Sequence, residues 1–148
     1  MKFLHLACTS TVAALLLSTM TATAADSAKK KADKAEARKS EAARPAKSQL
    51  LHVVSFKFKD SATKDDIKRV EDAFRALKSK VPQIKKLVWG LNNSPEGLNK
   101  GCTHAWVLTF GSESDRDAYL VHPDHKEFGK LVGPLLGDVF VVDFWTKD

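Results

Sequence analysis

Apolar and polar residues alternate along residues 50–58, which puts every second side chain on the same face and predicts a β-strand. From Thr63 the period changes, and apolar residues recur every three or four positions until Pro82, which predicts an amphipathic helix of about four turns. Thr63 and Asp66 have the spacing of a capping box at the start of that helix. The sequence therefore predicts a strand followed directly by a helix.

The same patterns predict the elements that follow. Strands are expected at residues 84–91 and 102–110, joined by a loop rich in asparagine, proline and glycine. Two helices are expected at residues 112–121 and 123–137, the second opening on a proline, before a last strand at residues 139–145. The resulting order is the ferredoxin-like β-α-β-β-α-β arrangement of the α+β class.

The two faces of the expected sheet differ in size. The larger face collects Leu50, His52, Val54, Phe56, Phe58, Cys102, His104, Trp106, Leu108 and Phe110. The smaller, flatter face collects Leu51, Val53, Ser55, Ala105, Val107 and Thr109, and the last strand is apolar on both sides. Because one layer of helices covers only one face, we expect a homodimer that packs sheet against sheet as a dimeric α/β barrel. We also expect the first and third strands to be parallel neighbours, which would put His52 and His104 side by side.

Composition separates this domain from the first 48 residues. Residues 1–24 have a positive residue, an apolar centre and an Ala-Thr-Ala cleavage pattern, as in a secretory signal peptide. Residues 25–48 are rich in alanine and lysine, include Pro45 and have no aromatic residue, which predicts a disordered linker or a short-lived helix. The globular domain is then residues 49–148. We expect an exported protein, periplasmic or secreted, with a membrane anchor formed by an uncleaved signal as the alternative.

The net charge of +6 belongs mostly to the linker. Residues 25–48 hold eight Lys and Arg against four Asp and Glu, whereas residues 49–148 hold fifteen against fourteen. A nucleic-acid-binding domain would carry a basic stripe on the fold itself, so no nucleic-acid partner is expected. The linker charge leaves open a contact with an anionic envelope surface. Cys102, the only cysteine after the signal, is expected to be a small buried residue, with a reactive thiol as the alternative.

Seven fragments in order resemble the stress-responsive dimeric A/B barrel (Dabb) family. They are LHVVSFKFKD, WG, SPEG, GCTH, TF, AYLVHPDH and VDF, spread over residues 51–144. The resemblance implies a dimer of ferredoxin-like domains. The family is broad and mostly without assigned activity, but it includes a plant cyclase that closes a linear polyketide by aldol condensation without a cofactor. The matching positions imply Tyr119 and His125 as the catalytic pair, with His52, His104 and His122 lining the ligand pocket.

The residue types fit that chemistry. A histidine in an apolar pocket stays neutral and can accept a proton, and a tyrosine can donate a hydrogen bond to a developing oxyanion. We expect no cofactor and no metal, because a His122/His125 pair three residues apart lacks the spacing of a known zinc motif. Each residue also has a structural interpretation, as a core histidine, a helix-entry residue or a packed tyrosine.

Two functions of different class remain open at this stage. The first is a stress-associated or small apolar ligand-binding dimer, which the breadth of the family favours. The second is a cofactor-independent lyase or cyclase that acts on a small carbonyl compound, with His125 as base and Tyr119 as oxyanion donor.

Overall fold

The computed structural model describes residues 26–36, 39 and 48–147, and the chain divides into two units, residues 1–43 and 44–148. In the first unit, residues 26–36 form a helix in which every residue is exposed. This helix falls in the stretch expected to be a linker, while the expected signal peptide lies outside the described residues. Within the described ranges, no helix has the length and apolar character needed to cross a membrane.

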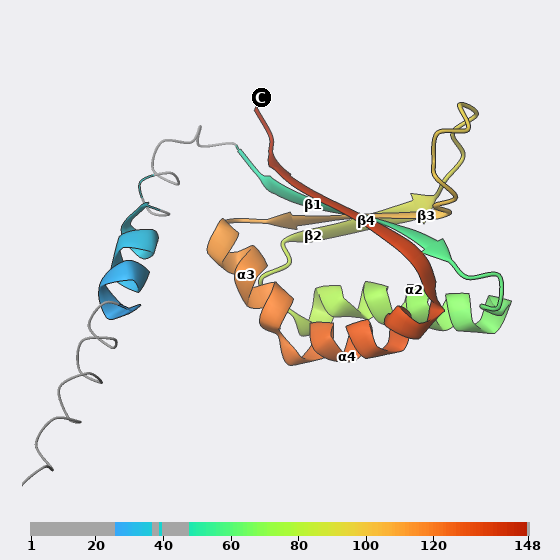
Figure 1. Ribbon diagram of the computed structural model, residues 1–148, viewed down its shortest axis with the longest axis horizontal. Coiled ribbons are helices and arrows are strands. Elements are labelled where there is room, and N and C mark those ends of the chain that lie inside the picture. Colours follow the sequence, from blue (N-terminus) through green and yellow to red (C-terminus); the bar gives the residue numbers. More distant parts are fainter. Residues whose placement is uncertain (1–25, 37–38, 40–47, 148) are drawn as a thin grey trace, which may run out of the picture. The chain divides into compact units, whose positions relative to one another are not determined.

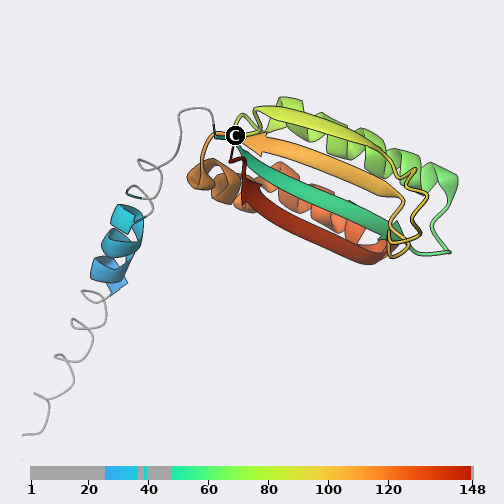
Figure 2. The ribbon, with the colours of Figure 1, turned by 90° about the horizontal axis from the view of Figure 1, so that it is seen from above.

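The second unit is built on a four-stranded sheet in the order β2-β3-β1-β4 (Figure 2). The strands are β1 (Leu50–Phe58), β2 (Lys86–Leu91), β3 (His104–Phe110) and β4 (Leu136–Trp145). Every neighbouring pair is antiparallel. The prediction that β1 and β3 are parallel is therefore wrong. The helix after β1 returns the chain so that β2 runs in the direction of β1, and the connection to β3 then reverses it.

All helices of this unit lie against one face of the sheet (Figure 1). They are α2 (Lys64–Lys80), α3 (Glu113–Val121), α4 (Pro123–Val132) and the short 3₁₀ helix η1 (Gly133–Leu135). The capping box of α2 is confirmed, since Thr63 and Asp66 exchange side-chain to backbone hydrogen bonds. The ferredoxin-like α+β fold predicted from the sequence is confirmed.

The connection from α4 to β4 differs from the prediction. Helix α4 ends at Val132 instead of continuing to residue 137, and β4 begins at Leu136, three residues earlier than expected. Pro134 lacks the backbone N–H that a continuing α-helix requires, and Leu136 already pairs with Phe58 beyond a register shift in β1. Strand pairing therefore includes Leu136 in β4, although the sequence pattern predicted a helix at this position. Strands β2 and β3 are each two residues shorter at their start than predicted.

The core fills the space between the sheet and the helices. Trp106 of β3 is fully buried and stacks on Phe74 of α2 and on Trp89 of β2, with ring centroids 4.2 and 4.7 Å apart. The buried apolar set is Leu50, Val54, Phe56, Val70, Phe74, Leu77, Val81, Ile84, Trp106, Leu108, Phe110, Tyr119, Phe128 and Val132. The face predicted to be the larger one is thus the face that the helices cover.

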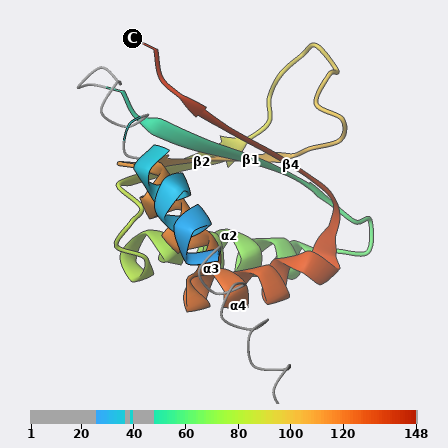
Figure 3. The same cartoon turned by 60° about the vertical axis from the view of Figure 1, so that its left-hand side comes forward.

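Among residues 48–147, no helix covers the opposite face of the sheet (Figures 1 and 3). Paired positions place a row of four valines across this face, from β4 to β2: Val142, Val53, Val107 and Val88. On β4 the exposed side chains of Phe140 and Phe144 flank the row. The loop between β2 and β3 projects from the sheet on the side away from the helices (Figure 3). The second, flatter apolar face predicted from the sequence is therefore present.

Candidate functional site

The junction between α3 and α4 brings two of the predicted site residues together. His122 ends α3, and its Nδ1 accepts a hydrogen bond of 3.2 Å from the backbone N–H of Asp124, which caps α4. The chain turns sharply at this cap and at Pro123, so that the rings of Tyr119 and His125 meet with centroids 4.2 Å apart. The sequence-predicted pair is therefore one cluster in space. His122 itself contributes as the cap between the two helices.

Tyr119 is the centre of this cluster. Its side chain is 1 % exposed and packs against Phe110 and against the edge of His52, with ring centroids 5.3 and 5.8 Å away. Burial raises the pKa of the Tyr119 phenol, so the hydroxyl keeps its proton at neutral pH. Among the described residues none forms a hydrogen bond with this hydroxyl. The hydroxyl is also not among the fully buried atoms without a partner, so it is a donor that a ligand can reach.

His125 is the half-buried member of the cluster. Burial lowers its pKa, and the nearby imidazoles of His52 and His122 act in the same direction, while the Leu120 carbonyl opposes them. The neutral ring donates from Nδ1 to the Leu120 carbonyl oxygen at 3.2 Å. This leaves Nε2 with its lone pair free. A neutral imidazole with a free nitrogen, next to a protonated phenol, has the form of a base beside a hydrogen-bond donor.

His52 reaches the cluster from the centre of β1, where it is 5 % exposed. Its Nδ1 donates to Oδ1 of Asp143 at 2.6 Å, and Oδ2 of Asp143 accepts from Nη1 of Arg116 at 2.5 Å. Burial raises the pKa of Asp143, but the hydrogen bonds from Arg116 and His52 outweigh it, and the net pKa is lowered. Asp143 therefore stays ionised and holds the His52 ring in one orientation.

Sequence reasoning did not identify Asp143 or Arg116 as site residues. One signal for Asp143 was present: among the β4 positions that face the helices, Val139, Val141, Asp143 and Trp145, it is the only charged residue. A lone carboxylate on an apolar strand face requires a partner. No comparable signal marks Arg116, which lies on a helix surface among other charged residues.

His104 does not join the cluster, which corrects the prediction that it stands beside His52. In the antiparallel register His52 pairs with Leu108, whereas His104 pairs with Phe56, four residues further along β1. There Nε2 of His104 donates to Glu71 at 3.1 Å, and Nδ1 accepts from the Thr103 hydroxyl at 2.8 Å. Both ring nitrogens of His104 are satisfied within the fold. These hydrogen bonds are those of a core histidine, and the residue also lines the cavity described next.

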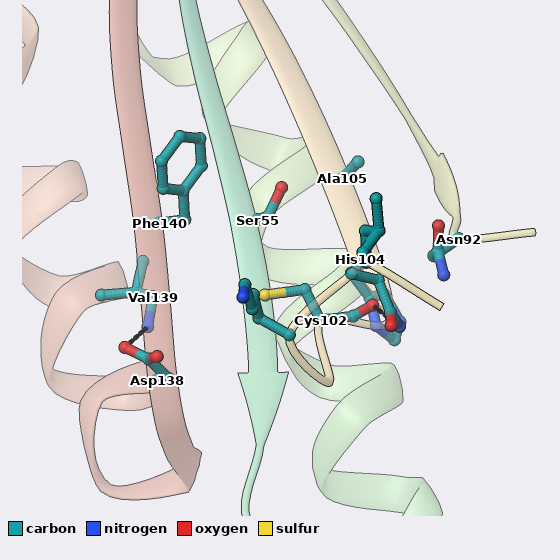
Figure 4. A pocket seen from close by; sticks show the side chains of 11 residues that line it. Ser55, Asn92, Cys102, His104, Ala105, Asp138, Val139 and Phe140 are labelled. Carbon is teal, nitrogen blue, oxygen red and sulfur yellow. Dashed lines mark hydrogen bonds between the residues drawn. The ribbon is translucent and has the colours of Figure 1, made fainter. Parts of the chain in front are cut away.

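A cavity lies between the β2–β3 loop and the open face of the sheet (Figure 4). Its volume is about 410 Å³, and its lining residues are Ser55, Asn92, Leu98, Asn99, Lys100, Cys102, His104, Ala105, Asp138, Val139 and Phe140. A smaller cavity lies between α2 and α4. Neither is lined by Tyr119 or His125. Cys102 is a free thiol of intermediate burial in the larger cavity instead of the buried core residue expected.

Within the described ranges, no three His, Cys, Asp or Glu side chains are arranged to hold a metal ion. The chemistry that these residues offer is acid–base chemistry. A base at His125 and a donor at Tyr119 share one cluster with the oriented His52 ring.

A four-stranded antiparallel sheet with its helices on one face defines the class as ferredoxin-like α+β. Residues 50–146 match the stress responsive A/B barrel domain (Dabb), and the chain belongs to that family.

Two curated relatives and one solved structure are similar to this chain. A stress-response A/B barrel domain-containing protein of Arabidopsis thaliana is 31% identical over 99 residues, covering 67% of this chain and 91% of the relative. Olivetolic acid cyclase of Cannabis sativa is 26% identical over 98 residues, covering 66% and 97%. A dimeric ferredoxin-like protein of unknown function from Thermobifida fusca is 28% identical with a TM-score of 0.56, covering 66% and 90%.

Proposed function

We propose that this chain is a cofactor-independent acid–base catalyst of the lyase or cyclase type that acts on a small carbonyl compound. One observation carries the proposal: the Tyr119 and His125 rings meet with centroids 4.2 Å apart, and Nδ1 of His125 is engaged by the Leu120 carbonyl while its Nε2 is free. The Tyr119 hydroxyl differs from Trp106 Nε1 of the core, because it is not among the fully buried atoms without a partner and can therefore be reached by a ligand.

The proposed step is enolisation. Nε2 of His125 takes a proton from the carbon next to the substrate carbonyl, and the C–H electron pair moves to form the enolate. Tyr119 donates its hydrogen bond to the oxygen on which negative charge develops, which lowers the barrier. The enolate carbon can then attack a second carbonyl carbon, forming a C–C bond, and the new alkoxide takes the proton back from His125. The sequence is proton-neutral overall and needs no oxidant or reductant.

Access to the cluster passes His125. Tyr119 is buried and neither cavity reaches it, whereas His125 is half-buried at the surface end of the cluster. In the proposed mechanism, substrate therefore approaches from the α3–α4 junction. The relative named olivetolic acid cyclase supports a cyclase reaction on this scaffold, while the relative named only for stress response leaves the substrate open.

Hydrogen–deuterium exchange tests this function without knowledge of the natural substrate. The full chain is incubated in D₂O with a panel of small ketones and 1,3-dicarbonyl compounds, and loss of the α-proton signal is followed by NMR. We expect catalysed exchange with at least one compound and its loss in His125→Gln. His104→Gln is the matched control, because it changes a histidine of the same sheet face outside the cluster. Equal loss in both variants, or no exchange above background across the panel, would refute the proposal.

A second candidate function is the binding of a small apolar ligand. It is favoured by the cavity of about 410 Å³, whose floor includes Ala105 and Phe140 (Figure 4). Binding of a small apolar probe such as benzaldehyde, measured by calorimetry, separates the two functions. Ala105→Trp fills the cavity and should abolish binding there, whereas Tyr119→Phe should leave it unchanged.

We further propose that the chain is a homodimer whose open sheet faces pack together. The row of valines across that face is exposed at its ends, with Val142 40 % and Val88 46 % accessible. The similar protein from Thermobifida fusca is described as dimeric. Light scattering should give a dimer mass, which Val142→Lys reduces to a monomer. Val141→Lys is the matched control, because Val141 is 50 % exposed on the other face of the same strand.

Export remains a proposal that rests on the signal-like pattern of residues 1–24. Fractionation of cells that express the full chain should recover it outside the cytosol, shortened by about two dozen residues. A full-length protein found in the membrane fraction would support the uncleaved-anchor alternative. A contact of the linker with an anionic surface would appear as salt-sensitive retention on anionic vesicles that is lost when its lysines are replaced by glutamine.

A further inference from the structure

Arg116 of α3 is linked to the His52 ring through one carboxylate. Its Nη1 donates to Oδ2 of Asp143 at 2.5 Å, and Oδ1 of the same carboxylate accepts from Nδ1 of His52 at 2.6 Å. The three side chains come from three elements, α3, β4 and β1, and 91 residues separate His52 from Asp143. One oxygen of the Asp143 carboxylate thus accepts from a guanidinium that is always charged, and the other accepts from the His52 ring.

We propose that Arg116 is a positioning residue: it fixes the Asp143 carboxylate so that His52 keeps its proton on Nδ1 and presents a free Nε2 within the Tyr119 cluster. The inference deepens the proposed acid–base function and rests on it for its catalytic meaning. The geometric part, which concerns the state of Asp143 and His52, stands independently of any substrate.

The charges around Asp143 favour this role. Asp117 accepts from Nε of Arg116 at 2.7 Å, which holds the guanidinium from its solvent side and directs Nη1 to Asp143. Tyr119 of α3 and His125 of α4 are neutral at neutral pH and do not compete for the carboxylate. Arg116 is therefore the cation that keeps Asp143 ionised when the His52 ring is neutral.

Arg116 is not the only link between α3 and β4. Nε1 of Trp145 donates to Glu113 at 3.1 Å, one helical turn before Arg116 and two residues beyond Asp143 on the same face of the strand. Because this second link remains when Arg116 is replaced, α3 should stay docked. Replacement of Arg116 should then change the pKa of Asp143 and the tautomer of His52 without moving α3.

The test is NMR of the full-length protein in three forms: wild type, Arg116→Met and Arg116→Lys. Carbon-13 signals follow the titration of the Asp143 carboxyl, and nitrogen-15 signals show which His52 nitrogen carries the proton. In Arg116→Met we expect the pKa of Asp143 to rise by about 1 pH unit or more, and the Nδ1–H form of neutral His52 to fall from dominant to mixed. Arg116→Lys keeps the charge and should restore most of both signals.

Arg75→Met is the matched control, because Arg75 forms a comparable ion pair with Asp72 on α2, away from the cluster. It should leave the signals of Asp143 and His52 unchanged. If Arg116→Met lowers stability but leaves the Asp143 titration and the His52 tautomer as in the wild type, Arg116 is a structural clamp and the inference is wrong. Failure of the proposed function would appear differently, as absent ketone exchange in a wild type with the expected NMR signals.

Discussion

His52 and His104 invite comparison because they share almost every coarse property. Each lies on a central strand, faces the helices, is 5 % exposed and contacts a carboxylate. They differ in how far their hydrogen bonds are satisfied. His104 uses both ring nitrogens, with Glu71 and Thr103, whereas His52 uses only Nδ1 and has Tyr119 and His125 beside it. Burial and residue type therefore do not separate these two histidines, but the number of ring nitrogens engaged in hydrogen bonds does. An unpaired buried atom is not by itself a mark of the site, because Nε1 of the core residue Trp106 also has no partner.

The largest expected effect is on the ketone exchange rate of Tyr119→Phe. Removal of the phenol hydroxyl should slow exchange by about 100-fold, because one oxyanion donor is lost. Stability should change by less than about 1 kcal/mol, since the hydroxyl has no partner to lose among the described residues. NMR exchange rates and urea unfolding measure the two effects. If Tyr119→Phe loses much stability while its exchange rate is unchanged, Tyr119 is a packing residue and not a catalytic one.

Substitution of His104 should mainly lower the free energy of unfolding. His104→Leu leaves Glu71 and Thr103 without their imidazole partner and should lower the free energy of unfolding by about 2 kcal/mol. His52→Leu should cost less, because Asp143 keeps its hydrogen bond to Arg116. Urea unfolding of both variants measures the difference. If His52→Leu is less stable than His104→Leu, the contrast drawn between the two histidines is wrong.

A smaller effect is expected at His122, which belongs to the cluster region but acts as a helix cap. His122→Ala should lower stability by about 1 kcal/mol, whereas His122→Asn, which can also accept from the Asp124 N–H, should retain it. Thermal unfolding and ketone exchange are measured together. Loss of exchange in His122→Asn at full stability would place His122 among the catalytic residues and not only at the cap.

The smallest expected effect is the pH dependence of stability. The pKa of His125 is lowered by burial from its usual 6.5, so the unfolded chain binds this proton at a higher pH than the folded chain does. Stability should therefore fall as pH drops below about 6.5 and level off below the folded pKa, and exchange should fall over the same window as the base is protonated. Urea midpoints at pH 7.5 and 5.5 measure it. The drop should shrink in His125→Gln and persist in His104→Leu.

Local sequence patterns predicted most of the fold and the turn at the α3–α4 junction, where the cluster lies. The alternation in β1, the capping box of Thr63 and Asp66, and the cap and proline at the α3–α4 junction all lie within a few residues of each other. Interactions of that range are visible in the sequence. The resemblance to the Dabb family supplied the pairing of Tyr119 with His125, and the local cap and proline explain why their rings meet. The separation of the sheet into a covered face and an open apolar face followed from the same alternation.

The remainder of the cluster depends on contacts between distant strands. His104 was placed wrongly because alternation fixes the face on which a side chain lies but not the direction or register of its neighbour, and the antiparallel register moved it four residues away from His52. Asp143 and Arg116 were not identified for a related reason, since their link to His52 exists only once β4 pairs with β1.

The sequence by itself determined the elements, their order and the two faces of the sheet, because these depend on periodicity and on hydrogen bonds between near neighbours. The tyrosine–histidine pair came from the resemblance of the sequence to the Dabb family. Only the tertiary structure decided which histidine is satisfied and which retains a free nitrogen. That outcome depends on strand register and on a carboxylate 91 residues away from the ring it holds.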